Sequence, residues 1–243
     1  MSKKRANNRR KKKEDRHPYE HYPTPQVVCD WTVKNMLPKR WFPIRVLDPG
    51  CGFGPYGKAI RHLWPHADIE LIGIDVCPEF NPPPGIYNHV IHDDFLRWAV
   101  NNPQEKFHVI LGNPWYEKVE QMIPVALNLL DPDWGVMCLL LALEFLGGQA
   151  RRKSMWKGQT PLLTTAISST RINFKGEEGT GDMRNHANYL WGPRRLANRF
   201  PPISWFDYLD GTVDVRDDNP LPHFNHQMEL FPCLEYPSTA SVT

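Results

Sequence analysis

The stretch VLDPGCGFGPYG, residues 46–57, decides the fold. It begins inside an apolar run, Ile44–Leu47, and passes through one acidic residue and three glycines into Pro55–Trp64, whose apolar residues have helical spacing. Glycine accepts backbone conformations that other residues avoid, so glycines at such a turn permit a tight bend and close approach of the backbone to a ligand. The stretch therefore predicts a strand, a ligand-binding turn and a helix.

The acidic residue at the end of this strand indicates which ligand the turn takes. The segment GFGPYG, residues 52–57, nearly matches the dinucleotide motif G-x-G-x-x-G, which alone is a weak signal. Asp48 would repel a pyrophosphate but attract a ligand that carries an ammonium group. S-adenosylmethionine has an amino-acid ammonium and a sulfonium and no phosphate. We therefore expect Asp48, Gly50 and Gly52 to bind this cofactor.

Apolar runs typical of buried strands alternate with segments of helical spacing along the chain. Such alternation indicates a mostly parallel sheet with helices on both faces. The segment 77–85, CPEFNPPPG, is too rich in proline for a regular helix, and no internal repeat is visible. The predicted strands are Ile44–Leu47, Ile69–Val76, Ile86–Ile91, Phe107–Leu111, Val136–Phe145, Thr164–Phe174 and His186–Trp191, and the predicted helices are Pro55–Trp64, Phe95–Val100 and Glu117–Leu130.

The next two strand ends carry groups that fit the rest of the same cofactor. Asp75 ends the second strand, and in such a fold its carboxylate can accept both ribose hydroxyls. Asp94 and Phe95 follow the third strand and can supply an acceptor for the adenine amino group and a ring against the purine. The alternatives are a helix cap for either aspartate and a core position for Phe95.

The stretch LGNPWYEK, residues 111–118, ends the fourth strand with an amide, a proline and two aromatics. The Asn113 side-chain oxygen and the Pro114 carbonyl can accept both N–H bonds of an exocyclic amino group and favour its pyramidal form during attack. If this amino group belongs to a nucleobase, Tyr116 would stack on the ring of the base and hold it near the methyl donor. The alternative is a turn with aromatic core residues.

Together these residues resemble S-adenosylmethionine-dependent amino-methyltransferases, most closely the adenine-N6 DNA methyltransferases of phages and prophages. YPTP at 22–25 resembles their upstream motif, DPGCGFG their glycine motif, IGIDV their ribose motif, DDF their adenine motif and NPWY their Asn-Pro-Pro-Tyr motif. A less specific match runs through LLLALEFLGGQARR and SSTRINF to HANYLWG, so the resemblance covers roughly residues 19–192.

The resemblance implies a Rossmann-like class I methyltransferase fold and a role for each matching residue. It assigns Thr24 to the methionine end of the cofactor, and it implies that Phe174 packs against the other face of a flipped base. By the same resemblance, cofactor binding falls to Thr24, Asp48, Gly50, Asp75, Asp94 and Phe95, and catalysis to Asn113, Pro114 and Tyr116.

Two departures from the family pattern affect the substrate side. Trp115 replaces the usual second proline, so the indole could change the loop or the width of the base pocket. Few residues remain for reading a target sequence, and we expect the nucleic-acid backbone to be held by basic side chains between and after the catalytic motifs. Scattered surface charge is the alternative. These side chains are Arg151, Arg152, Lys153, Lys157 and Arg184, with Lys175, Arg194, Arg195 and Arg199 nearby.

The net charge of +2 hides a strongly basic start. Residues 1–16 hold nine Lys or Arg and two Asp or Glu, a net charge of +7, and the remainder carries −5. We expect residues 1–18 to form a disordered arm that grips polyphosphate or serves as an import signal, with a solubility tail as the alternative. Residues 19–200 are then the methyltransferase domain, and 201–243 form an extension rich in proline and aromatics.

Other patterns argue against several classes of protein. Five scattered cysteines without C-x-x-C favour neither a disulfide framework nor a cysteine zinc site. The spacings His62/His66, His89/His92 and His223/His226 are compatible with metal ligands, but lone pairs do not make a site, so no metal is expected. With no apolar window of membrane-spanning length and no apolar stretch after the basic start, we expect a cytoplasmic protein, nuclear in a eukaryotic host, that is not secreted.

The sequence therefore favours an enzyme that methylates adenine N6 in DNA with the base flipped out of the helix. RNA adenine methylation and methylation of a protein glutamine amide use the same chemistry, and the basic arm favours nucleic acid over protein. A non-catalytic nucleic-acid-binding or assembly subunit is the alternative of another class. The chain could act as a homo- or hetero-oligomer.

Overall fold

The computed structural model describes residues 22–37, 44–148, 151, 155, 161–174, 184–199, 203–208 and 213–215. Within these ranges one sheet holds all the strands, which are β1 (Ile44–Pro49), β2 (Ile69–Asp75), β3 (His89–His92), β4 (Val109–Gly112), β5 (Val136–Ala142), β6 (Leu162–Ser168), β7 (His186–Trp191), β8 (Ile203–Phe206) and β9 (Val213–Val215). The spatial order is β3-β2-β1-β4-β5-β7-β6-β8-β9. The first five strands in this order are mutually parallel, β7 is antiparallel to β5 and β6, β8 is parallel to β6, and β9 is antiparallel to β8.

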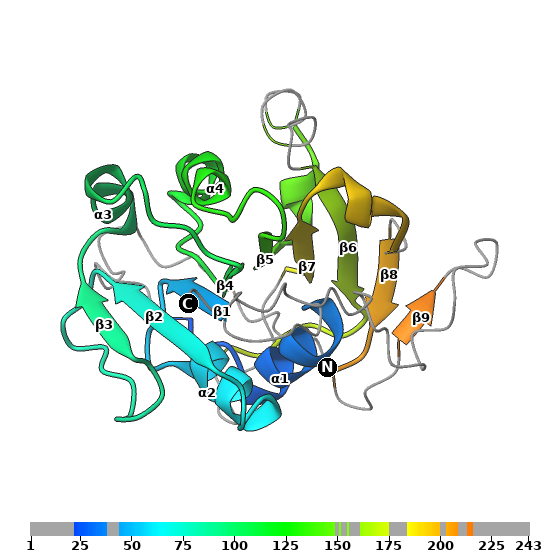
Figure 1. Ribbon diagram of the computed structural model, residues 1–243. Coiled ribbons are helices and arrows are strands. Elements are labelled where there is room, and N and C mark those ends of the chain that lie inside the picture. The colour runs from blue at the N-terminus through cyan, green and yellow to red at the C-terminus, as the bar shows by residue number, and fades with distance from the viewer. Residues whose placement is uncertain are drawn as a thin grey trace, which may run out of the picture.

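Helices cover both faces of this sheet, as the sequence predicts (Figure 1). The helices α1 (Gln26–Met36) and α2 (Pro55–Leu63) lie on one face, and α3 (Phe95–Asn101) and α4 (Val119–Asn128) lie on the other. Two short 3-10 helices, η2 (Leu143–Leu146) and η4 (Arg194–Arg199), follow β5 and β7. The prediction of a mostly parallel, Rossmann-like α/β sheet is confirmed.

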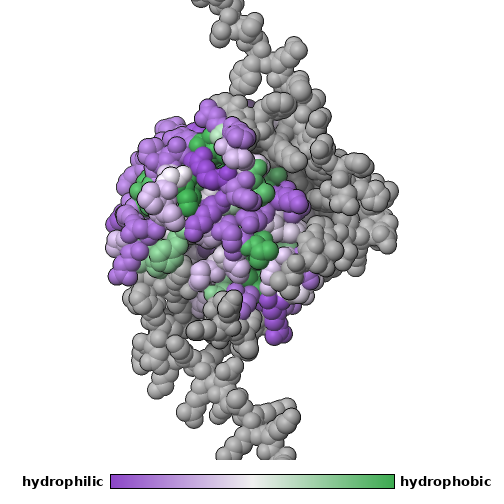
Figure 2. Space-filling model, turned by 90° about the horizontal axis from the view of Figure 1, so that it is seen from below, coloured by the Kyte–Doolittle hydropathy of each residue, from purple (hydrophilic) through white to green (hydrophobic). Residues whose placement is uncertain are grey.

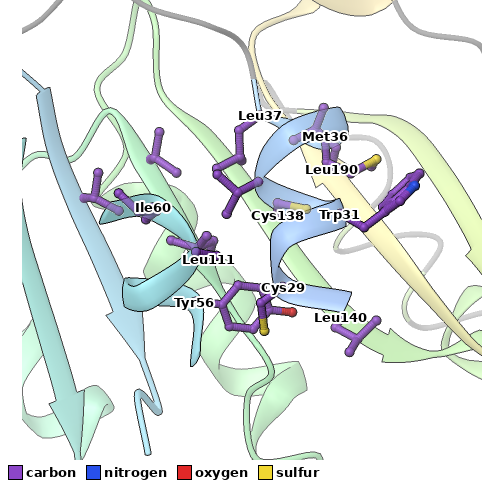
Figure 3. Close-up of a cluster of buried hydrophobic side chains, with 14 of the residues drawn as sticks. Cys29, Trp31, Met36, Leu37, Tyr56, Ile60, Leu111, Cys138, Leu140 and Leu190 are labelled. Carbon is purple, nitrogen blue, oxygen red and sulfur yellow. The ribbon is translucent and has the colours of Figure 1, made fainter. Parts of the chain in front are cut away.

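Two separate apolar clusters form the core, one on each face of the sheet. On the face of α1 and α2, side chains of both helices meet those of β4, β5 and β7 (Figure 3). Every residue of β4 and β5 is buried. Because burial of one large aliphatic side chain is worth about 1.5–3 kcal/mol, these central strands are firmly held. The labelled residues of this cluster are Cys29, Trp31, Met36, Leu37, Tyr56, Ile60, Leu111, Cys138, Leu140 and Leu190.

The first helix was not predicted, because the sequence lacks the usual start signal for it. Pro25 precedes α1 and offers no side-chain cap. The helix also buries a polar residue, Thr32, whose hydroxyl donates to the Val28 carbonyl at 2.8 Å and lies 3.2 Å from the Asn188 side-chain oxygen on β7. A polar residue in the buried face interrupts the apolar periodicity from which a helix is predicted.

Most other elements agree with the prediction, with shifted ends. The strand expected at 86–91 begins only at His89, the strand expected to reach Phe145 gives way to η2 after Ala142, and the strand expected to reach Phe174 ends at Ser168. The structure after residue 193 could not be read from the sequence. There β8 and β9 extend the sheet, and Phe206 stacks on Trp31 of α1 with ring centroids 3.9 Å apart.

The described surface below α1 and α2 is mostly hydrophilic. Figure 2 views the molecule from this side, and apolar side chains appear on it as small separate groups. Among the helices of the described ranges, none is long and apolar enough to cross a membrane.

Candidate functional site

The predicted site residues of three strands meet at one edge of the sheet. Strand β1 lies between β2 and β4, and all three are parallel, so their carboxyl ends are neighbours (Figure 1). Asp48, Asp75 and Asn113 stand at or just after these ends. The chain reverses its direction of strand addition at β1, and open α/β sheets bind ligands in the crevice at such a point.

The glycine turn after β1 is held by the aspartate that ends β2. Gly50, Gly52 and Gly54 have φ values of 95°, 53° and 78°, the left-handed region that glycine enters at no steric cost. Asp75 accepts the Gly52 N–H through Oδ2 and the Cys77 N–H through Oδ1, both at 2.9 Å. Each carboxylate oxygen accepts more than one hydrogen bond, so Asp75 keeps capacity for a ligand hydroxyl.

Asp48 is a buried carboxylate in which only one of the two oxygens accepts a hydrogen bond from the described residues. It is 1% exposed, and its Oδ2 accepts the Tyr87 hydroxyl at 2.6 Å. Its Oδ1 is buried and has no hydrogen-bond partner in the described part of the chain. Burial, helped by the charge of Asp75 and opposed by the Tyr87 hydrogen bond, raises the pKa of Asp48 from 3.8 to about 7. A buried acceptor of this kind fits an ammonium group, because burial without a partner is costly.

Glycine at residue 112 keeps the space beside that oxygen open. A Cβ atom there would lie 3.0 Å from Oδ1 of Asp48. Tyr87, which holds the other oxygen, was not predicted as a site residue. It lies 39 residues from Asp48 in the chain, and no local pattern marks the pair.

Asn113 is fixed by the segment that precedes α1. Its Nδ2 donates to the Tyr22 carbonyl at 3.3 Å and to the Thr24 hydroxyl at 3.1 Å. A carbonyl oxygen only accepts, so the amide nitrogen has to face Tyr22, which settles the orientation of the amide. Its Oδ1 is buried without a hydrogen-bond partner within the described ranges. The Asn113 side chain therefore places a hydrogen-bond acceptor in a fixed orientation at the end of β4.

Aromatic rings from four segments form a chain beside this amide. The Tyr22 and Phe174 ring centroids are 6.2 Å apart, those of Phe174 and His186 4.9 Å, and those of His186 and Tyr116 6.1 Å. His186 begins β7 and is fully buried, so it braces the two rings predicted to hold a base. Sequence reasoning missed His186, since the only available signal was its place at the start of a strand.

The residues at the third strand end take the alternative roles weighed from the sequence. Asp94 caps α3, with Oδ1 accepting the Leu96 and Arg97 N–H groups at 2.9 and 3.3 Å. Its Oδ2 pairs with the Lys118 ammonium at 2.6 Å, and this hydrogen bond is the main cause that lowers the pKa of Asp94. Phe95 is 7% exposed and belongs to the core under α3 and α4. Contact of either residue with a cofactor stays a prediction.

Trp115 is partly exposed on the surface of the protein. It is 40% exposed, and the Lys118 ammonium lies 5.3 Å from the centroid of its ring. Lys118 thus contacts both Trp115 and Asp94, a link that the sequence did not suggest. A contact of Trp115 with a substrate base stays a prediction.

The predicted backbone-binding residues are only partly described. Arg151 pairs with Glu120 at 2.5 Å, donates to the Gly147 carbonyl at 2.7 Å and lies over the Phe145 ring, so its charge already has protein partners. Contact of Arg151 with a nucleic-acid phosphate stays a prediction. Arg184 is exposed just before β7. Arg152, Lys153 and Lys157 lie outside the described residues.

No group of three or more His, Cys, Asp or Glu residues within the described ranges is arranged to hold a metal ion. The pair His223/His226 and the basic arm 1–18 lie outside the described residues.

Proteins with similar sequences or structures include methyltransferases. No protein-family model matches the chain. A type II methyltransferase, M.TthHB8I of Thermus thermophilus, is 29% identical over 136 residues, which make up 56% of this chain and 28% of that protein. A modification subunit of a putative type I restriction enzyme from Vibrio vulnificus superposes with a TM-score of 0.56 and 16% identity, over 77% of this chain and 47% of that one.

A type I restriction-modification methyltransferase subunit from Streptococcus thermophilus gives a TM-score of 0.52 and 16% identity, over 76% of this chain and 47% of that one. The fold is that of the class I methyltransferases. This chain spans 28% of the curated relative and about half, 47%, of each of the two solved chains.

Proposed function

We propose that this chain is an S-adenosylmethionine-dependent methyltransferase that acts on the exocyclic N6 of adenine in DNA. The observation that carries the proposal is the state of Asn113. Its amide nitrogen is bound by Tyr22 and Thr24, and its oxygen is buried at the end of β4 without a hydrogen-bond partner in the described part of the chain. An acceptor prepared in this way suits a substrate that presents N–H bonds.

The cofactor would lie over the glycine turn between the ends of β1 and β2. The buried Asp48 Oδ1 fits its ammonium group, and the glycine at residue 112 leaves room beside that oxygen. Asp75 already holds the turn through Gly52 and retains lone pairs for the ribose hydroxyls. When bound, the cofactor supplies an electrophilic methyl group on a sulfonium.

The protein's part in the chemistry is to prepare the amino nitrogen. The lone pair of an exocyclic amine is delocalised into the base, so the nitrogen attacks well only when it becomes pyramidal. The Asn113 oxygen and the Pro114 carbonyl accept its two N–H bonds and stabilise the positive charge that develops during attack. Preorganised groups of this type contribute roughly 2.7–4 kcal/mol to the transition state.

Two aromatic side chains would hold the base. Tyr116 would stack on one face of the flipped base, with Phe174 against the other. The His186 ring, at the start of β7, contacts the rings of both Tyr116 and Phe174 and so helps to fix their positions. Stacking on an aromatic side chain is worth about 1–3 kcal/mol per base, enough to favour an extruded base that is already unpaired.

DNA is favoured over other substrates by charge and by similarity. Nine basic residues among the first sixteen suit a polyphosphate partner. The matched segment of the Thermus protein belongs to a type II methyltransferase. RNA adenine and protein glutamine offer the same kind of amino group.

The decisive experiment uses methyl-labelled S-adenosylmethionine with DNA, RNA and protein in parallel, followed by nucleoside mass spectrometry. Labelled N6-methyladenine from DNA is the expected product. Label in RNA or on glutamine would overturn the choice of substrate, and cofactor binding without transfer would indicate a non-catalytic subunit.

Asn113→Ala should lower the single-turnover rate about 10²–10³-fold with little change in cofactor affinity, because Asn113 faces the base. A near-normal rate would refute the mechanism.

A further inference from the structure

We infer that the Tyr22 carbonyl and the Thr24 hydroxyl position the catalytic amide, and that Thr24 acts chiefly through Asn113. The inference rests on the proposed function and changes the role that the family resemblance implies for Thr24. That resemblance places Thr24 at the methionine end of the cofactor. The structure instead brings its hydroxyl within 3.1 Å of the Asn113 Nδ2.

The contact between Thr24 and Asn113 is partly buried. Thr24 is 6% exposed, and the Asn113 side-chain oxygen is buried as well. Both hydrogen atoms of the amide nitrogen are used, one on Tyr22 and one on Thr24. The Tyr22 contact, at 3.3 Å, lies beyond the usual range for N–H···O bonds, so the shorter Thr24 contact is the stronger restraint.

The segment 22–25 is itself anchored to both sides of the site. The Gln26 side chain donates to the Pro55 carbonyl at 2.9 Å, which ties the start of α1 to the start of α2 after the glycine turn. On the base side, the Tyr22 ring meets Phe174 edge-on. These two contacts anchor the segment 22–25 and so hold the Thr24 hydroxyl in place.

An unrestrained asparagine would often present the wrong group. Rotation of its terminal torsion by 180° exchanges oxygen and nitrogen, and these torsions are broad and roughly two-fold. After this rotation the amide N–H groups of Asn113 would face the N–H groups of the substrate, and no hydrogen bond could form between them. The Tyr22 carbonyl, which can only accept, selects the orientation in which the Asn113 oxygen is free to accept from an amino group, and the shorter hydrogen bond to the Thr24 hydroxyl holds the amide there.

The test compares Thr24→Val with Thr24→Ser. Valine preserves the shape and removes the acceptor, whereas serine keeps the hydroxyl. At saturating cofactor we expect Thr24→Val to slow single-turnover methyl transfer about tenfold, the loss of one hydrogen bond, with cofactor affinity changed less than the rate. Thr24→Ser should recover most of the rate. Thr165→Val, a buried threonine on β6, controls for the Thr-to-Val change itself.

Two kinetic results would overturn the inference. One is a slow Thr24→Val enzyme whose rate returns fully at saturating cofactor, since Thr24 would then be a cofactor ligand only. The other is an equal loss in Thr24→Val and Thr24→Ser, since the hydroxyl would then be irrelevant.

A spectroscopic readout separates this inference from the proposed function. In protein labelled with ¹⁵N-asparagine, the side-chain NH₂ signals of Asn113 are those that vanish in Asn113→Ala. Thr24→Val should shift or broaden these signals, and Thr24→Ser should leave them nearly in place. Unchanged signals in Thr24→Val would refute the inference even if DNA is methylated, whereas a failure to methylate any substrate would refute the proposed function alone.

Discussion

Cofactor affinity should fall steeply as the pH drops below about 7, because Asp48 must be ionised to bind an ammonium group. Burial raises the pKa of this carboxyl from 3.8 to about 7. The ammonium of the cofactor stays protonated below about 7.7, so between pH 5 and 7 Asp48 is the partner whose charge changes. If only the ionised form binds, the Kd rises about tenfold per pH unit below 7, or about 100-fold at pH 5.

The assay is calorimetric titration with S-adenosylmethionine between pH 5 and 8, on the wild type and on Asp48→Asn. The amide keeps an oxygen for the Tyr87 hydroxyl but carries no charge. We expect Asp48→Asn to bind about 10–100-fold more weakly near pH 7.4, the range for a hydrogen bond to a charged group, and to lose the pH dependence between 5 and 7. A wild-type Kd that is flat over this window would refute the assignment of Asp48 to the ammonium.

The same carboxyl should affect the stability of the cofactor-free protein in the opposite direction. Its pKa is higher in the folded state than in the unfolded state, so its contribution is fully present below about pH 4 and is lost as the pH rises through about 7. A shift of about three units corresponds to a loss on the order of 4 kcal/mol, at about 1.36 kcal/mol per unit. Asp48→Asn should therefore be less sensitive to pH in denaturant unfolding over this window, and a curve parallel to that of the wild type would contradict the pKa.

Three further outcomes test the cofactor, the base pocket and the arm. Asp75→Ala should weaken cofactor binding by about 1.5–3 kcal/mol in calorimetry, and an unchanged affinity would remove Asp75 from the site. Tyr116→Ala should weaken binding of a duplex with an extruded adenine by about 1–3 kcal/mol, whereas Tyr116→Phe should be mild, and equal losses in the two would exclude stacking. Deletion of residues 2–16 should flatten the plot of log DNA affinity against log salt, and an unchanged slope would leave targeting as the role of the arm.

The sequence predicted the turns that follow β1 and β4 well because each depends on local pattern, whereas the ends of β3, β5 and β6 were misplaced by several residues. The buried run before Asn113 and the glycine turn after Asp48 both stand where they were expected, and β7 matches its predicted bounds. The partners of those residues could not be predicted, because they come from distant parts of the chain. Thr24 is 89 residues from Asn113, and no periodicity or spacing connects the two. Asp94 shows a different limit, because its carboxylate suits both a helix cap and a ligand contact; the structure has the cap, and the ligand contact stays a prediction.

The packing of α1 gives the site a particular place in the folding of the chain. This helix precedes every strand in sequence, yet Thr32 meets Asn188 across 156 residues, and Trp31 stacks on Phe206 of β8. Contacts between such remote residues have a high cost in loop-closure entropy and form after local ones. The parallel sheet can therefore acquire its strands before the segment 22–25 reaches the end of β4. Methyl transfer should be the last property to appear during refolding, later than the circular dichroism of the helices.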